Sequence, residues 1–111
     1  MSITKITAEN FDSEVLGSEV PVIIDFFASW CGPCRIMGEV FDRLADKRHD
    51  VKFCKSDVEE ATGLAEEFGV LSVPTVVLIR NGETVATSVG VRNEAALEAL
   101  IDSVREESDS L

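Results

Sequence analysis

The order of apolar and polar positions along the chain predicts alternating strands and helices. Residues 20–28 form an almost continuously apolar run, which is typical of a strand buried on both faces of a sheet. From residue 31 to about residue 47, apolar side chains instead return every three or four positions, which predicts a helix with one buried stripe. The apolar positions of this helix are Ile36, Met37, Val40, Phe41, Leu44 and Ala45. Residues 51–58 predict a second strand, and the helical connection makes it parallel to the first.

Shorter elements precede and follow this strand, helix and strand. Residues 3–6 predict a short edge strand, and Thr7 is the predicted N-cap of a helix. The apolar face predicted for that helix consists of Phe11, Val15 and Leu16. Residues 59–68 predict another helix, which ends at Gly69 because glycine readily adopts the left-handed conformation found after helices.

The last third of the chain predicts a hairpin and a final helix. The dipeptide Asn81-Gly82 separates two β-rich runs and favours a tight turn in which both residues have positive φ. Asn93 is the predicted N-cap of a helix whose apolar stripe consists of Leu97, Leu100, Ile101 and Val104. The whole pattern predicts an α/β protein with a mixed sheet of about five strands flanked by four helices. We expect one domain over residues 1–111, with a flexible acidic tail at about residues 106–111.

The composition is that of a globular protein. With 45% hydrophobic and 28% charged residues in a chain of 111, the sequence can bury a core without help from a metal or a disulfide. A formal net charge of −11 argues against nucleic-acid binding, which needs clustered Lys and Arg. Residues 1–10 lack the basic region and the apolar stretch of a secretory signal, so none is expected, and no apolar run approaches the roughly 20 residues of a membrane span. A cytoplasmic location without membrane attachment is therefore expected.

The first long strand leads directly into a pair of cysteines, in the sequence ASWCGPCR at residues 28–35. Cys31 and Cys34 are three positions apart, and at the first turn of a helix this spacing lets a disulfide close without rebuilding the backbone. Pro33 suits an early helical position, where its missing N–H costs nothing. Gly32 is expected to leave the first sulfur uncovered. The pair is therefore a candidate redox site.

The two cysteines are expected to differ in reactivity. Cys31 would lie beside the unpaired N–H groups at the helix N-terminus, whose partial positive charge favours thiolate over thiol. Cys34, one turn further into the helix, would be shielded from large substrates and well placed to resolve a mixed disulfide formed on Cys31. Asp25 is a further candidate, because a carboxylate inside a buried strand either needs a partner or has a raised pKa.

Four segments together resemble the thioredoxin family. They are DFFASWCGPCR at residues 25–35, SVPT at residues 72–75, the turn at residues 81–82 and the Val-Gly pair at residues 89–90. The order and spacing of these segments are similar to those of thioredoxins over nearly the whole chain. The resemblance implies a thioredoxin fold and a general protein disulfide reductase, which passes electrons to disulfide-containing proteins and is recycled by a thioredoxin reductase. It also implies a monomer without a metal or an organic cofactor.

The resemblance further implies roles for individual residues. Cys31 would be the nucleophile and Cys34 the resolving thiol. Asp25 would accept a proton beneath Cys34, and Lys55 would lie near Asp25. The apolar rim that receives an extended substrate segment would consist of Trp30, Gly32, Pro33, Val73, Pro74 and Gly90. The peptide bond between Val73 and Pro74 is expected to be cis.

Two positions depart from the family pattern. Glu39 stands where thioredoxins commonly have a proline that kinks the helix, and Phe27 stands where many members have tryptophan. Without the proline, the helix is expected to be straighter or to bend at Gly38 instead. These departures concern the fine tuning of the reduction potential and leave the exchange reaction itself intact.

Other interpretations of the same residues remain open. A structural zinc site would use the spacing C-x2-C-x14-H-x4-C, with the ligands Cys31, Cys34, His49 and Cys54. A binding module would use the same fold, with its redox chemistry incidental. A buried ion pair would make Asp25 structural rather than catalytic. Outside a zinc site, Cys54 is expected to be a small buried strand residue.

Overall fold

The sheet has five strands in one layer. The computed structural model describes residues 3–109, and the side chains of residues 3–104. Its strands are β1 (Thr4–Lys5), β2 (Val22–Phe27), β3 (Lys52–Asp57), β4 (Thr75–Arg80) and β5 (Glu83–Val89), in the spatial order β1-β3-β2-β4-β5. Strands β1 and β2 both run parallel to β3, whereas β4 is antiparallel to β2 and to β5. The predicted mixed sheet is confirmed.

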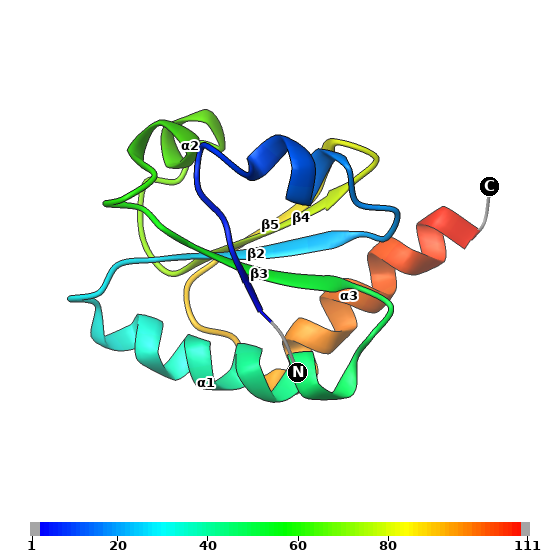
Figure 1. Ribbon diagram of the computed structural model, residues 1–111. Coiled ribbons are helices and arrows are strands. Elements are labelled where there is room, and N and C mark those ends of the chain that lie inside the picture. Colours follow the sequence, from blue (N-terminus) through cyan, green and yellow to red (C-terminus); the bar gives the residue numbers. More distant parts are fainter. Residues whose placement is uncertain (1–2, 110–111) are drawn as a thin grey trace.

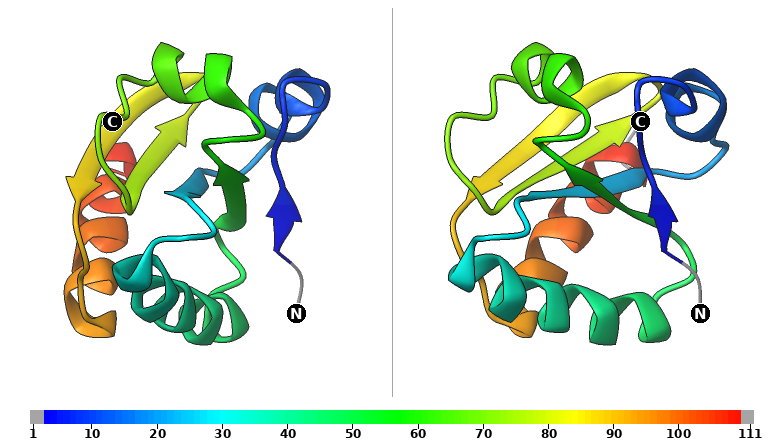
Figure 2. Two further views of the ribbon diagram at one scale, coloured as in Figure 1. Left: turned by 90° about the vertical axis from the view of Figure 1, so that its left-hand side faces the viewer. Right: turned by 60° about the vertical axis from the view of Figure 1, so that its left-hand side comes forward.

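Helices cover both faces of this sheet. They are η1 (Asp12–Leu16), which is a π-helix, α1 (Gly32–Lys47), α2 (Thr62–Glu67) and α3 (Glu94–Asp109). Helices α1 and α3 lie on one face of the sheet, and η1 and α2 lie on the other (Figures 1 and 2). The predicted arrangement of four helices around a central sheet is therefore confirmed. Within residues 3–109, no helix is both long enough and apolar enough to cross a membrane.

Strand β2 contributes to the hydrophobic core on both faces. Its successive side chains point to opposite sides, because side chains alternate along a strand. Ile23 packs in the core under α1 and α3, whereas Ile24 and Phe26 pack in the core under η1 and α2. Asp25 is two positions after Ile23 and therefore faces α1. The alternation thus places a carboxyl group in the same layer as the first turn of α1.

Two helix starts differ from the prediction. The Thr7 N–H donates to Asn10 Oδ1 at 2.8 Å, in a turn that precedes η1, so Thr7 is not the N-cap of that helix. Helix α2 begins at Thr62 rather than at Glu59. The Glu59 N–H donates to Asp57 Oδ1 at 2.8 Å, and this contact belongs to a turn that delays the helix.

Three apolar residues that were predicted to be buried are exposed. Val20, the first residue of the run that predicted the buried strand, is 42% exposed and precedes β2. Leu16 is 49% exposed and Ile36 is 58% exposed. Ile36 directly precedes the buried Met37, and neighbouring residues in a helix point about 100° apart, so Ile36 lies off the stripe that covers the sheet. Leu16 in the same way follows the buried Val15 at the last position of η1.

The last third of the chain agrees with its predicted turn and cap. Asn81 and Gly82 have φ values of 53° and 79°, as the turn between β4 and β5 requires. Asn93 Oδ1 accepts the Ala96 N–H at 2.8 Å and so caps α3. Because α3 extends to Asp109, residues 106–109 of the predicted tail are helical. Residues 110 and 111 lie outside the described residues, and flexibility of the tail stays a prediction.

Candidate active site

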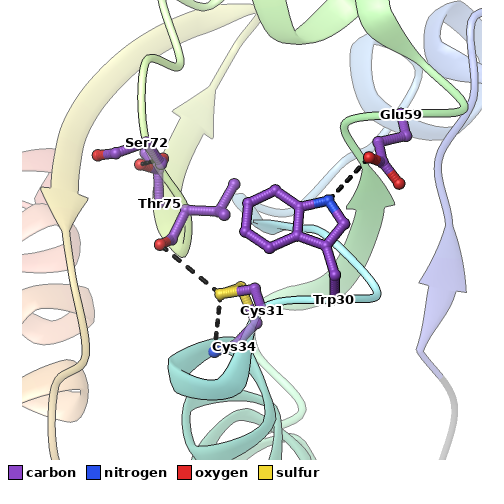
Figure 3. The surroundings of a disulfide bond; sticks show 7 residues. Trp30, Cys31, Cys34, Glu59, Ser72 and Thr75 are labelled. Atoms are coloured by element: carbon purple, nitrogen blue, oxygen red, sulfur yellow. Dashed lines mark hydrogen bonds between the residues drawn. A yellow bond between two sulfur atoms is a disulfide. The ribbon is translucent and has the colours of Figure 1, made fainter.

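Cys31 and Cys34 form a disulfide at the start of α1, with their Cα atoms 5.2 Å apart (Figure 3). Cys31 is the N-cap of the helix, and its Sγ accepts the Cys34 N–H at 3.2 Å. Pro33 lies in the first helical turn, as predicted. The N-terminus of α1 therefore places partial positive charge beside the Cys31 sulfur, where it can stabilise a thiolate once the disulfide is reduced.

The two cysteines differ in what they face rather than in how exposed they are. The sequence predicts an uncovered Cys31 and a shielded Cys34, but the two residues are 4% and 6% exposed. Cys34 is shielded as predicted, but the prediction for Cys31 was wrong because the loop before β4 covers the first sulfur, with the Val73 carbonyl oxygen 3.8 Å from Cys31 Sγ. Cys31 lines hollows on both sides of the disulfide, whereas Cys34 lines only one of them.

The hollow that Cys31 lines without Cys34 is apolar, and we call it the apolar groove. It has a volume of about 530 Å³, and its lining includes Trp30, Gly32, Pro33, Val58, Leu71 and Val73. Leu71 is 98% exposed and Trp30 is 69% exposed, so two large apolar side chains stand at the surface in the hollow that Cys31 lines. A Cβ atom at Gly32 would meet nothing within 4 Å, so the missing side chain leaves space for a partner rather than for the protein itself.

The predicted substrate-binding residues divide into two groups. Four of them line the apolar groove: Trp30, Gly32, Pro33 and Val73. Pro74 and Gly90 do not line it but contact each other, since the Gly90 N–H donates to the Pro74 carbonyl oxygen at 2.8 Å. Gly90 has a φ of 93°, which favours glycine. The peptide bond between Val73 and Pro74 is cis, as the family resemblance implies.

A hydrogen bond that the sequence analysis missed fixes the orientation of Trp30. The Trp30 Nε1–H donates to Glu59 Oε2 at 2.7 Å (Figure 3). Glu59 belongs to the turn after β3, 29 positions further along the chain. It is one of 21 acidic residues, and no local pattern distinguishes an acid that binds an indole from an acid that only faces solvent.

The second hollow contains several charged side chains, and we call it the carboxylate pocket. It has a volume of about 390 Å³, and its lining includes Asp25, Cys34, Arg35, Glu39, Asp42 and Lys55. Asp25 is 1% exposed, and within the described residues its Oδ1 accepts no hydrogen bond. Burial raises the pKa of Asp25 to about 7, an effect that the charge of Lys55 opposes and the charge of Asp42 increases. A carboxyl group that titrates near neutral pH therefore shares a pocket with Cys34.

Lys55 lies beside Asp25, but its ion pair is with another residue. Asp25 and Lys55 are partners in the register of β2 and β3, so both face α1. The Lys55 Nζ lies 2.9 Å from Asp42 Oδ1, on α1. The structure thus brings a lysine next to the buried carboxyl group, as expected, and joins it to a second carboxylate that the sequence analysis did not single out.

The geometry contradicts a zinc site built from the four candidate ligands. Cys31 and Cys34 are joined to each other, and His49 lies beyond the far end of α1. A helix of 16 residues is about 24 Å long, so His49 cannot share a metal with these cysteines. Cys54 is a free cysteine on β3 with 0% exposure, which confirms its prediction as a small buried strand residue. Burial raises the pKa of its thiol to about 12.

Known proteins are similar to this chain in sequence. Its sequence matches the thioredoxin family over residues 2–103. The chain belongs to the thioredoxin family. Thioredoxin from Porphyra purpurea is 34% identical over 103 residues, which are 92% of this chain and 96% of the relative. Thioredoxin from Haemophilus influenzae is 39% identical over 101 residues, which are 90% of this chain and 94% of the relative.

Some relatives in this thioredoxin family are longer. Mitochondrial thioredoxin from Mus musculus is 43% identical over 93 residues, which are 83% of this chain but 56% of the relative. The chain therefore spans just over half the length of that relative and of a chloroplastic thioredoxin from Oryza sativa. The shared region contains the CGPC pair, whose two sulfurs form a disulfide here.

Proposed function

We propose that this member of the thioredoxin family is a general protein dithiol-disulfide oxidoreductase. The observation that carries the proposal is the Cys31–Cys34 disulfide, which closes at the start of α1 between the apolar groove and the carboxylate pocket. In the reduced form, the same two sulfurs hold the two electrons that a substrate disulfide needs. Family membership supports the same activity.

Reduction of a substrate would proceed in two exchange steps. The Cys31 thiolate attacks one sulfur of the substrate disulfide, which forms a mixed disulfide and releases the other substrate sulfur as a thiolate that takes up a proton. Cys34 then loses its proton and attacks Cys31, which forms the Cys31–Cys34 disulfide and releases the second substrate sulfur as a thiol. The substrate gains two electrons and two protons, and the chain is oxidised by the same amount.

Asp25 would support the second step as the proton acceptor for Cys34. Its carboxyl group lines the same pocket as Cys34, and a carboxyl group with a pKa of about 7 can accept a proton at neutral pH. The pocket has room for a bridging water and offers it polar partners in Asp25 and Lys55. In this proposal Lys55 acts as the charged neighbour that tunes the acceptor.

The apolar groove favours extended substrate segments that carry an apolar side chain next to the reactive cysteine. Such a segment would cover Trp30 and Leu71, and the removal of their apolar surface from water would stabilise the complex. Pro74 and Gly90 would support the groove from behind Val73. The formal net charge of −11 also favours substrates with basic residues around their disulfide.

A separate thioredoxin reductase would return two electrons to the disulfide after each cycle. The cycle needs a reducing compartment, and we assign it to the cytoplasm, although mitochondrial and chloroplastic relatives carry the same family name. The chain would work as a single-domain monomer without a metal or an organic cofactor, since its sulfurs carry the electrons themselves.

The substitution Cys34→Ser tests the proposal directly. Without the resolving thiol, the variant should accumulate a mixed disulfide between Cys31 and a substrate protein, seen by non-reducing electrophoresis and mass spectrometry. Cys31→Ser should lose both reduction and trapping. Cys54→Ala should retain both, because that thiol is buried and protonated at neutral pH.

Two outcomes of this experiment would refute the proposal. A partner-dependent function that survives Cys31→Ser would make the chain a binding module rather than an oxidoreductase. Trapping by the Cys31→Ser variant, through the remaining Cys34, would show that the order of attack is reversed.

A further inference from the structure

Lys55 has two carboxylates near its ammonium group and pairs with the outer one. The Lys55 Nζ lies 2.9 Å from Asp42 Oδ1, and the Asp42 side chain is 50% exposed. Asp25, the register partner of Lys55, is 1% exposed, and within residues 3–109 its Oδ1 has no hydrogen-bond partner. A Cβ atom at Gly38 would lie 3.5 Å from Lys55 Nζ, so the ammonium group rests against α1 at this glycine.

The choice of partner decides what Asp25 can do. An ammonium group in contact with a buried carboxylate favours its charged form, which then gives up the ability to bind a proton at neutral pH. Asp42 is four positions after Gly38 and therefore lies on the same side of α1, where it competes for the lysine. Pairing at this more exposed position also requires less desolvation of the lysine than pairing with Asp25 would.

We propose that Asp42 is a positioning residue for the exchange reaction. It holds the Lys55 ammonium group against α1, which leaves Asp25 without a cationic partner and free to exchange a proton with Cys34. This inference rests on the proposed function, because it explains how the suggested proton acceptor is kept ready. Asp42 touches neither the sulfurs nor a substrate and acts only through Lys55.

The other groups around Asp25 do not replace this arrangement. The charged residues that line the pocket with it are Arg35, Glu39 and Asp42 from α1 and Lys55 from β3. On the other side of β2, strand β4 places the apolar Val76 opposite Asp25. The charge of Lys55 lowers the pKa of Asp25 and the charge of Asp42 raises it, as expected for a lysine shared between two carboxylates. Among the described ion pairs, Lys55 is joined to Asp42 and not to Glu39, which makes Glu39 a matched control.

The test measures the NMR chemical shift of the side-chain carboxyl carbon of Asp25 during a pH titration. The protein is kept in its disulfide form, in which neither Cys31 nor Cys34 titrates. Asp42→Asn frees Lys55 to approach Asp25, so the midpoint should fall from about 7 in the wild type to about 6. Glu39→Gln removes one negative charge from the same pocket without freeing the lysine. Glu39→Gln should therefore lower the Asp25 midpoint by at most about half as much as Asp42→Asn does.

A second variant separates release of the lysine from loss of a charge. In a Lys55→Met background, Asp42→Asn should move the midpoint no further than Glu39→Gln does in the wild type, because no lysine remains to be released. The pH profile of disulfide reduction by Asp42→Asn should move to lower pH together with the Asp25 midpoint. Equal shifts for Asp42→Asn and Glu39→Gln, or a full shift in the Lys55→Met background, would overturn the inference.

Failure of the inference and failure of the proposed function can be told apart. The NMR titration uses no substrate, so it reports on Asp42 and Lys55 even if the protein reduces no disulfide. Conversely, if the pH profile of disulfide reduction does not follow the Asp25 midpoint in any variant, Asp25 takes no part in the reaction. The effect of Asp42 on the Asp25 midpoint, measured by NMR, would still stand.

Discussion

The apolar groove and the carboxylate pocket meet at one disulfide, yet they place their residues in opposite ways. The groove keeps apolar side chains in water, with Leu71 98% exposed. The pocket keeps a carboxyl group out of water, with Asp25 1% exposed. Each placement is unfavourable for the free protein. In the proposed function they would give two almost equally buried cysteines different roles, since Cys31 lines both hollows and Cys34 lines only the carboxylate pocket.

The two regions are also built from different parts of the fold. The groove is formed by the first turn of α1 and by the loops after β3 and before β4, whereas the pocket is formed largely by β2, β3 and α1 themselves. Loops on a rigid scaffold suit contact with varied partners, and regular elements hold charged groups at fixed positions. Substitutions in the groove should therefore change substrate binding, and substitutions in the pocket should change rate and stability.

The largest effect is expected at Asp25, in the carboxylate pocket. Its pKa of about 7 in the folded protein exceeds the ordinary value of 3.8, so the folded state binds this proton more tightly than the unfolded state. The contribution of this raised pKa to the free energy of unfolding is fully present below about pH 4 and is lost as the pH rises through about 7. Asp25→Asn removes the charge, so its free energy of unfolding at pH 8 should exceed that of the wild type by about 4 kcal/mol in urea denaturation.

Two further measurements on Asp25→Asn check the reason for this effect. At pH 4 the variant and the wild type should be almost equally stable, because Asp25 then carries its proton in the folded state. At pH 7 the variant should reduce disulfides at least about tenfold more slowly, although it remains folded. If turnover at pH 7 is unchanged, Asp25 has no part in proton transfer.

Much of the fold could be predicted because its signals are local. The turn at Asn81 and Gly82 and the cap at Asn93 depend on a few neighbouring residues, and the structure confirms both. The long strand and the long helix follow from apolar periodicity over many positions. The errors at Thr7 and Leu16 arise where a single turn of π-helix replaces the regular helix that the pattern predicts, because too few residues define a period there. The start of α2 and the exposure of Ile36 were also predicted wrongly.

The site was predictable only where its residues are close in the sequence. Cys31 and Cys34 stand in one short motif, and Asp25 is conspicuous because it interrupts an apolar strand. Glu59 and Asp42 could not be identified in this way, since each binds a partner that only the fold brings near. The cover over Cys31 was missed for the same reason, because it comes from a loop 42 positions further along the chain.

On the groove side, Leu71→Ala should give an intermediate effect. Burial of the leucine side chain against a substrate is worth about 1.5 kcal/mol, so its loss should raise KM for a protein disulfide about tenfold and leave kcat nearly unchanged. The free energy of unfolding should not change, because Leu71 is 98% exposed in the free protein. Leu16→Ala is the matched control, at a leucine that is 49% exposed and lies outside the groove. A KM that both substitutions leave unchanged would mean that substrates do not dock on the apolar groove.

The smallest effect is expected at the hydrogen bond between Trp30 and Glu59. Its removal tests whether this bond holds the indole in one orientation at the apolar groove. Both side chains are accessible to water, which competes for the bond, so its loss should cost at most about 1 kcal/mol and raise KM up to about fivefold. Glu59→Ala removes the acceptor, whereas Glu59→Gln keeps an oxygen that can accept the indole N–H. Trp30 is the only tryptophan of the chain, so its fluorescence anisotropy should fall in Glu59→Ala and stay near the wild-type value in Glu59→Gln. Equal anisotropy and equal KM in both variants would show that packing against the groove, without the hydrogen bond, already holds the indole in place.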